Sequence, residues 1–489
     1  MFSSAASDLV RIPLELFTAV ASYLPNCAIK NLRLTCRLIH DRAPLRLNRV
    51  FLSPNPRNVE VFRAIADHDG YRTDIVEIIW DDTQLMLNVM DLQCGHPCVT
   101  ESNHPDLTAT KQRLNAQLPL ATSWNYYQGL LKQQEERFPA LKRITITPAA
   151  HGMLYLPTYE TPMIRAFQAG FNYPIPRGWP ISERQESFPF MSEWAIKPEK
   201  DIWRGFNIIT SELATTNRDH GITELILDVN HLFTSLNFHI FEEPNTEYNN
   251  LVTILRRLGF SRFDLALLSE GQQDEGWSSF RSGYLKRALS EASDIQHFSL
   301  QSHVDHFSFH QPCSLDNFVP LRTILPVERW HKLRHFGLVH YLVKQDDLLS
   351  LLAALPRSVR SVELGFLTFL GGGNRNYRVH GDGSWRDLCD DMHNNLDWRD
   401  RAVGERPTVT VLCEHNALVI PWRYIWIRTA ISEFLYGDAK NPFRHPGHTP
   451  VLERGEVART PFIPALGFAH KKDPGVMRRV DGRMRLCYD

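Results

Sequence analysis

A pattern of apolar and polar positions recurs along the middle of the chain. In each copy the first, fourth and sixth residues are apolar and polar residues stand between them, as at Leu141, Ile144 and Ile146. The alternation that ends the pattern is typical of a half-buried strand, and the first apolar residue suits the turn that enters the strand. The copies occupy residues 141–146, 222–227, 260–265, 295–300, 333–338 and 359–364.

Segments with helical spacing of apolar residues lie between these predicted strands. Residues 248–258 place Leu251 and Ile254 on one face, and residues 280–292 and 346–355 carry similar faces. Helix and short strand alternate at an interval of roughly 26 to 38 residues, which is typical of a solenoid. The pattern resembles the start of a leucine-rich repeat, although its period is long and irregular. An α+β or α/β fold is therefore expected, with a non-repetitive α/β domain as the alternative to the solenoid.

The rest of the chain divides into segments of different character. We predict an irregular leucine-rich-repeat-like region over residues 138–436 and an irregular tail over residues 437–489. Residues 53–137 are predicted to form a helical connector with one strand at 75–80. Residues 148–207 are dense in proline and aromatic residues, so we expect an ordered insertion over one edge of the solenoid. Packing that seals this edge is favoured over a substrate pocket.

The N-terminal residues 9–52 are predicted to contain a pair of short helices. Pro13 suits the first turn of a helix, and an apolar stripe runs from Leu16 until Pro25 ends the helix. Leu34 lies off the stripe of the second helix, which is therefore apolar on two sides. Such a pair cannot bury all its faces against itself, so it needs the rest of the chain or a partner. The stripe of the second helix consists of Ile29, Leu32, Cys36 and Ile39.

Four short motifs follow one another in this segment. They are Ile-Pro-Leu-Glu at 12–15, Tyr-Leu-Pro at 23–25, Leu-Arg-Leu-Thr-Cys-Arg at 32–37, and the closing residues 44–52. In this order the segment resembles an F-box, the helical module by which a substrate receptor docks on a cullin–RING ubiquitin ligase. Ile12 stands where the family usually has Leu. The alternative is an ordinary helical hairpin that packs on the domain after it.

The resemblance implies that the segment binds a groove of a Skp-family adaptor, which links it to a cullin and its RING subunit. The chain would then be the substrate-recognition subunit of a Skp–cullin–F-box ubiquitin ligase and not itself an enzyme. Its C-terminal region would bind an unknown protein target and raise the effective concentration of that target. The residues expected to contact the adaptor are Ile12, Pro13, Leu14, Leu16, Leu24, Leu32, Leu34 and Cys36.

Two alternatives remain open for the function. One is an F-box scaffold that binds the adaptor without delivering ubiquitin. The other is a hydrolase whose site is assembled from distant residues between positions 140 and 430. Spacing along the sequence cannot reveal such a site.

Composition limits the class of protein and its partners. A chain of 489 residues exceeds the size at which one core keeps growing, so two domains or an elongated repeat array are expected. The hydrophobic fraction of 43% and the charged fraction of 22% are typical of a soluble globular protein. A formal net charge of −1 gives no global basic field that would attract nucleic acid or an anionic membrane. No apolar run approaches the ~20 residues needed to span a bilayer.

The cysteines and the first residues indicate the compartment. The eight cysteines are scattered, which favours reduced thiols in the cytoplasm or nucleus over a disulfide framework. The chain starts without an apolar segment behind a basic one, so it does not resemble a secretory signal.

Few residues suggest chemistry. Cys94, Cys98 and His104 do not have the spacing of a zinc knuckle, and a loop with incidental thiols is the favoured interpretation. The histidines at 303, 306 and 310 lack a carboxylate at a known spacing. The adjacent acids Asp81 and Asp82 do not converge on one point if they lie on a strand or helix. No metal and no cofactor is predicted.

Overall fold

The computed structural model describes a large part of the chain. The described residues are 11–24, 26–53, 55–83, 137–148, 159, 161–166, 172–174, 178–180, 193–195, 197–215, 221–229, 234–269, 276–303, 318–370, 384–414, 424–443, 456–457, 468–470, 476–480 and 483–487.

One twelve-stranded sheet organises the molecule. Nine of its strands form one continuous parallel run, in which each strand pairs with the next in chain order. The nine strands are β1 (Arg49–Leu52), β2 (Glu77–Asp81), β3 (Arg143–Thr147), β5 (Glu224–Leu227), β7 (Arg262–Leu268), β8 (His297–His303), β9 (His335–Val339), β11 (Ser361–Gly365) and β13 (Thr408–Glu414).

Short strands complete the sheet at its edges. Strand β6 (Leu236–Asn237) pairs in parallel with the end of β7. After β13 the sheet turns antiparallel through β14 (Tyr424–Ile427) and β15 (Glu456–Val457). A separate two-stranded pair joins β10 (Leu342–Val343) to β12 (Thr368–Phe369).

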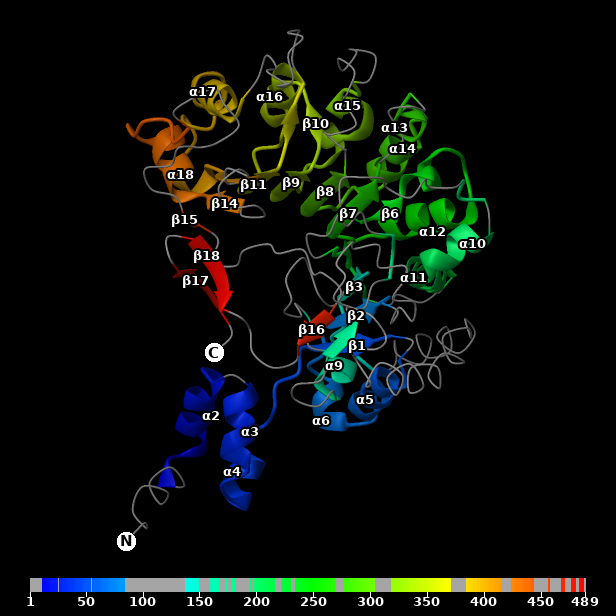
Figure 1. Ribbon diagram of the computed structural model, residues 1–489, viewed down its shortest axis with the longest axis vertical. Coiled ribbons are helices and arrows are strands. Elements are labelled where there is room, and N and C mark those ends of the chain that lie inside the picture. Colours follow the sequence, from blue (N-terminus) through cyan, green and yellow to red (C-terminus); the bar gives the residue numbers. More distant parts are fainter. Residues whose placement is uncertain are drawn as a thin grey trace.

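Helices connect the parallel strands and lie on one side of the sheet. Figure 1 shows the strands along the inner side of an arc and the helices along its outer side. The mixed α/β class predicted from the sequence is thereby confirmed. The helices are α5 (Pro56–Ala66), α6 (Asp69–Arg72), α11 (Arg204–Thr215), α12 (Thr246–Leu255), α13 (Ser278–Arg281), α14 (Tyr284–Ser290), α15 (Leu321–Ile324), α16 (Gln345–Ala353), α17 (Trp385–Asn395) and α18 (Thr429–Tyr436), with short 3-10 turns η4 (Phe238–Phe241), η6 (Val327–Arg329) and η7 (Val403–Glu405).

The repeated pattern explains the core between sheet and helices. All six predicted strands are present, as β3, β5, β7, β8, β9 and β11. Their first, fourth and sixth positions are buried in one continuous apolar cluster. Because the strands are in register, the fourth positions form a ladder in which Phe263 pairs with Phe298 and Phe298 with Phe336. The outer helices cover this ladder; Trp330 packs on Phe298 with ring centroids 4.7 Å apart.

The segments around the repeated region contribute to the same sheet. The strand predicted at 75–80 is β2, and α5 and α6 are the helices in the described part of the predicted connector 53–137. The rest of that connector, residues 84–136, lies outside the described residues. In the predicted insertion 148–207 the structure describes α9 (Pro162–Ala166), β4 (Asn172–Pro174) and α10 (Lys197–Ile202). Helix α11 begins at Arg204, so the helical layer resumes before the predicted end of the insertion.

Beyond α18 the structure describes more regular elements than the irregular tail that the sequence predicted. Strand β16 (Phe468–His470) pairs antiparallel with β4, which belongs to the insertion far away in the sequence. Strands β17 (Val476–Val480) and β18 (Arg483–Cys487) form an antiparallel hairpin. No described helix is long and apolar enough to cross a membrane.

Three helices at the N-terminus form a small module set apart from the arc (Figure 1). The N-terminal module consists of α2 (Leu14–Ser22), α3 (Asn26–Arg33) and α4 (Arg37–Arg42). The prediction of one continuous second helix is wrong. Thr35 Oγ1 bonds back to the carbonyl of Leu32 at 2.6 Å, and Cys36 is extended with φ −161° and ψ 160°. This break lets Ile29 and Ile39 reach the same core.

Arg46 ties the module together. Its guanidinium donates to the carbonyls of Ser22 at 2.6 Å and Ala21 at 3.1 Å, and also to that of Leu24. The carbonyls of Ala21 and Ser22 lie in the last turn of α2 and that of Leu24 follows it, where the regular hydrogen bonds of a helix are missing, so the arginine supplies donors at this helix end. The side chain of Asn26 exchanges two hydrogen bonds with the backbone of Arg46, at 2.6 Å and 3.1 Å. The start of α3 and the end of α2 are thereby held to one residue.

Candidate functional site

The N-terminal module has an exposed apolar surface. Nine large apolar side chains of the described residues are exposed, and six of them belong to this module. Tyr23 and Leu34 are 89% and 86% exposed, values that leave almost the whole side chain in water. A small module with this much apolar surface resembles one half of an interface. The six side chains are Leu14, Leu16, Val20, Tyr23, Leu34 and Leu38.

The structure separates the eight predicted adaptor contacts into two groups. Three of them, Ile12, Leu24 and Leu32, are half-buried and pack against the core of the module. The remaining five are exposed, and these are Pro13, Leu14, Leu16, Leu34 and Cys36. The first group supports the module, whereas the second group forms part of its surface.

Two exposed residues of α2 were absent from the predicted set. Val20 and Tyr23 follow Leu16 by four and seven residues, which places all three on one helical face. That spacing is visible in the sequence. Tyr23 also belongs to the Tyr-Leu-Pro motif, so the sequence carries a signal for both residues.

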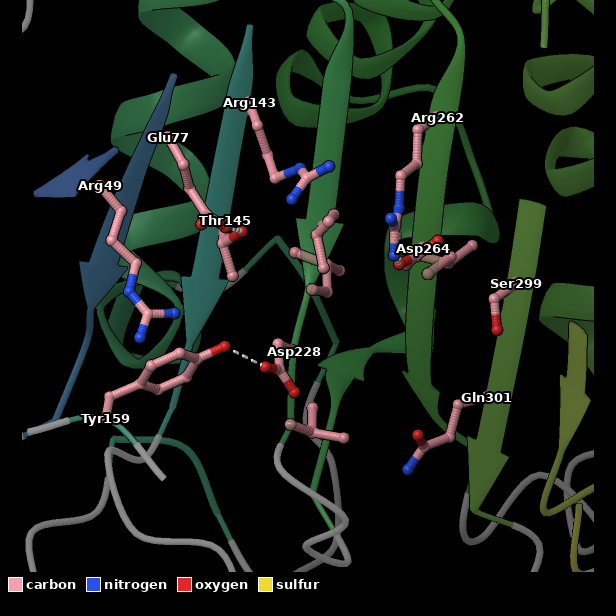
Figure 2. A pocket seen from close by; sticks show the side chains of 14 residues that line it. Arg49, Glu77, Arg143, Thr145, Tyr159, Asp228, Arg262, Asp264, Ser299 and Gln301 are labelled. Carbon is pink, nitrogen blue, oxygen red and sulfur yellow. Dashed lines mark hydrogen bonds and ion pairs between the residues drawn. The ribbon is translucent and has the colours of Figure 1, made fainter. Parts of the chain in front are cut away.

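A second candidate is a pocket on the inner face of the sheet (Figure 2). The inner pocket has a volume of about 430 Å³ and spans strands β1 to β8. Tyr159, from the insertion, lines one side of the pocket, and Thr145 of β3 and Ile226 of β5 also line it. Leu227, Val229 and Leu265 are also apolar, whereas the other lining side chains are polar or charged: Arg49, Glu77, Arg143, Asp228, Arg262, Asp264, Ser299 and Gln301.

The wall residue Tyr159 is held by three contacts. Its hydroxyl donates a hydrogen bond to Asp228, its ring meets Phe51 edge-on at 6.1 Å, and the guanidinium of Arg49 lies 5.8 Å from the ring centre. Burial and the neighbouring Asp228 carboxylate raise the pKa of Tyr159 well above its usual value. The phenol therefore stays protonated and serves as a hydrogen-bond donor.

Two histidines stack beside the inner pocket. The rings of His297 and His335 are 4.0 Å apart and tilted by only 13°. His297 Nε2 lies 3.0 Å from the Asp264 carboxylate, and His335 Nδ1 lies 3.1 Å from the hydroxyl of Ser361. Burial, helped by the charge of His297, lowers the pKa of His335 to about 4. Burial acts against ionisation of Asp264, but His297 and Arg262 outweigh it and hold the pKa of that carboxyl below its usual value.

This arrangement bears on the hydrolase alternative. A serine relay needs one histidine between the hydroxyl and the carboxylate. Here the hydroxyl of Ser361 pairs with His335 and the carboxylate of Asp264 pairs with His297. The two pairs belong to different rings, so these side chains do not form that relay.

Asp81 and Asp82 have separate surroundings. Asp82 is buried and accepts hydrogen bonds from the indoles of Trp80 and Trp179 at 3.1 Å and 2.9 Å. It also accepts from Arg204 Nε at 3.1 Å and from the backbone N–H of Gly205 at 3.3 Å. These donors come from β2, the insertion and α11, so Asp82 joins three segments of the chain.

The neighbouring carboxyl group of Asp81 is buried and has a raised pKa. One carboxylate oxygen accepts from the N–H of Thr83 at 3.2 Å, and the other is buried with no hydrogen-bond partner in the described part of the chain. Burial raises the pKa of Asp81 to about 6.

The remaining sequence candidates provide no site. Cys94, Cys98 and His104 lie outside the described residues, as do His306 and His310, while His303 ends β8. In the described ranges no three His, Cys, Asp or Glu side chains are grouped so that they could hold a metal ion. No family model matches the chain, and no curated protein matches it in sequence.

Proposed function

We propose that the chain is the substrate-recognition subunit of a Skp–cullin–F-box ubiquitin ligase. The N-terminal module docks on a Skp-family adaptor, and the inner face of the sheet binds a protein target. The protein acts in the cytoplasm or nucleus and supplies position, not catalysis. The observation that carries the proposal is the exposed apolar surface of the module, which coincides with the F-box-like motifs.

Burial energetics support docking through this surface. Covering apolar surface gains roughly 25 cal/mol per Å², so a groove that accepts several large apolar side chains provides a substantial part of a binding energy. Phe17, Ile29 and Ile39 already occupy the core of the module. The exposed side chains are therefore available to a partner without unfolding the helices.

The order of the strands supports the second half of the proposal. Described helices or helical turns lie between β1 and β2 and between successive strands of the parallel run from β3 to β13, and the parallel strands pair in chain order, an arrangement that supports an irregular leucine-rich-repeat-like solenoid. Proteins built in this manner use their extended inner surfaces for binding. The inner pocket offers polar and charged groups on such a surface.

Adaptor binding can be tested by co-purification with a Skp-family protein. The test variant combines Leu16→Asp with Leu34→Asp, since both side chains are exposed. The matched control combines Thr18→Asp with Asn31→Asp, which adds the same charges at exposed polar positions. On the helical wheel Thr18 lies roughly 160° from Leu16.

The wild type and the control are expected to bind, and the leucine variant to lose on the order of 2 kcal/mol of binding free energy. Circular dichroism verifies that every variant is folded. A wild type that does not bind, or a folded leucine variant that binds normally, would contradict the proposal.

Ubiquitin transfer separates the receptor from the scaffold alternative. The complex is reconstituted with cullin, RING subunit and a ubiquitin-charged enzyme, and the partners that co-purify with the chain are examined for ubiquitin. Modification that is lost in the leucine variant supports a receptor. Bound partners that are never modified would favour the scaffold.

A further inference from the structure

Charged side chains of alternating sign form a row across the inner face of the sheet. They occupy the third position of the repeated pattern and the matching positions of β1 and β2. The register pairs these residues strand by strand, so that each lies beside the next. This charge row consists of Arg49, Glu77, Arg143, Glu224 and Arg262.

The alternation limits which partner the row can recognise. Arg143 pairs with Glu224 at 2.6 Å, and Arg262 pairs with Asp264 at 2.5 Å. Their fields cancel at a distance, so a polyanion such as a nucleic acid gains little from the arginines. A partner gains attraction at every position only if it carries both signs in the complementary order.

The spacing of the row indicates the conformation of such a partner. Neighbouring strands lie ~4.8 Å apart, so three successive members span ~9.6 Å. On an α-helix, residues at i, i+3 and i+7 rise by ~4.5 Å and ~10.5 Å along one face. In an extended strand, residues on the same face are ~6.7 Å apart. The third such residue would therefore lie several ångströms beyond the third member of the charge row. A helix therefore matches the row better than an extended segment.

The row is accessible to side chains of a partner. Arg49 is exposed, and its recorded contact within the described residues is the ring of Tyr159. The side chains of Arg143 and Glu224 remain 33% and 20% exposed, so charged groups of a partner can contact their outer atoms while the pair stays together. The charge row borders the inner pocket, whose volume of about 430 Å³ suits the side chains of one helical face.

We infer that the inner face binds a target helix that carries acidic and basic residues in alternation at steps of three and four residues. Acidic side chains of the helix face Arg49 and Arg143, and basic ones face Glu77 and Glu224. The inference deepens the proposed function, since it names the class of target for the sheet. Its test omits the adaptor, so the two proposals can fail independently.

Two fluorescent alanine-rich helical peptides serve as probes. Both carry two Glu and two Lys on one face at steps of three and four residues. One has the order Glu, Lys, Glu, Lys and the other has the order Glu, Lys, Lys, Glu. Their composition and net charge are equal, but the like-charge pair lowers the helicity of the second peptide. Circular dichroism measures the helicity of each peptide, and the anisotropy-measured affinities for the full chain are compared after correction for it.

The matching protein variant combines Arg143→Glu with Glu224→Arg. The exchange keeps an ion pair between β3 and β5 but changes the order of signs along the row. The wild type is expected to prefer the alternating peptide roughly tenfold at low salt, and the variant to prefer the other peptide. Circular dichroism and the denaturant midpoint verify that the variant is otherwise intact.

Equal binding of both peptides by the wild type would overturn the inference, as would a folded variant that keeps the wild-type preference. A second comparison applies even if the variant does not fold. The wild type should also prefer the alternating helix to a proline-containing extended peptide with Glu and Lys at every second residue. Equal or tighter binding of the extended peptide would overturn the helical part of the inference.

Discussion

The N-terminal module and the sheet use apolar residues in opposite ways. Along the sheet, the apolar positions of each repeated pattern are buried between strands and helices. In the module a few residues such as Phe17 and Ile29 form the core, while Leu16 and Tyr23 stand in water. The sheet buries its apolar side chains against its own outer helices. The module leaves part of its apolar surface exposed.

This difference shows that apolar content alone does not distinguish a buried core from an exposed apolar surface. Both regions have helices with apolar stripes, and both stripes follow the same spacing. The two regions differ in what their helices pack against. Each outer helix packs on the wide surface of the sheet, whereas the three short helices of the module have only one another and remain partly uncovered. Substitutions that affect one region and spare the other therefore test the comparison.

The largest effect is expected at Asp82. Asp82→Ala removes the acceptor of two indoles and leaves the buried guanidinium of Arg204 without its carboxylate. Breaking a buried pair of this kind costs about 4 kcal/mol. We expect a large drop in the denaturant midpoint of the sheet, measured by tryptophan fluorescence. Asp69→Ala, at a residue with an 89% exposed side chain, is the control and should change little.

An intermediate effect separates a core leucine from a surface leucine. Leu338→Ala empties a fully buried position of β9 and should cost about 3 kcal/mol of unfolding free energy. Leu16→Ala, at a 60% exposed side chain, should change stability by less than about 0.5 kcal/mol while weakening adaptor binding. Denaturation curves and co-purification measure the two outcomes. If Leu16→Ala destabilises the chain as strongly as Leu338→Ala, the contrast between the regions is wrong.

The smallest effect depends on pH. Because the pKa of Asp81 is raised to about 6, the folded state retains a proton that the unfolded state releases between about pH 4 and pH 6. Asp81 therefore destabilises the protein increasingly as the pH rises through this window. Asp81→Asn should stabilise the chain on the order of 2 kcal/mol at pH 7 and by almost nothing below pH 4.

The lowered pKa of His335 has the opposite effect on the pH dependence of stability. As the pH drops from about 6.5 to about 4, His335 takes up a proton in the unfolded state but not in the folded state, so the folded state becomes less stable. Because both proteins contain His335, its contribution cancels when the unfolding free energy of the wild type is subtracted from that of Asp81→Asn. Thermal denaturation at several pH values measures the difference, with Asp438→Asn as an exposed control. A stability difference that is independent of pH would show that the charge of Asp81 is not the cause.

The strands were predictable because local and distant requirements agree. The apolar residues of 295–300 favour a strand by their alternation, and the same residues face the core. The break at Thr35 was not predictable from the apolar stripe, because a side-chain bond to Leu32 decides it.

The partners of Asp82 were hidden for a different reason. Trp179 and Arg204 lie 97 and 122 residues further along the chain, and spacing cannot indicate such contacts. The charge row is an intermediate case. Arg143, Glu224 and Arg262 share the third position of the pattern, which is visible in the sequence. That they lie side by side with alternating sign follows only from the pairing order of the strands.

The sequential order of the parallel strands has a consequence for the history of the gene. Because each unit of strand and helix pairs with the units before and after it, an internal duplication or deletion changes the length of the sheet without changing pairing elsewhere. The antiparallel strands β14 and β15 would continue to close the far edge. Descendants of one ancestral gene can thus acquire inner faces of different reach while inheriting the same N-terminal module.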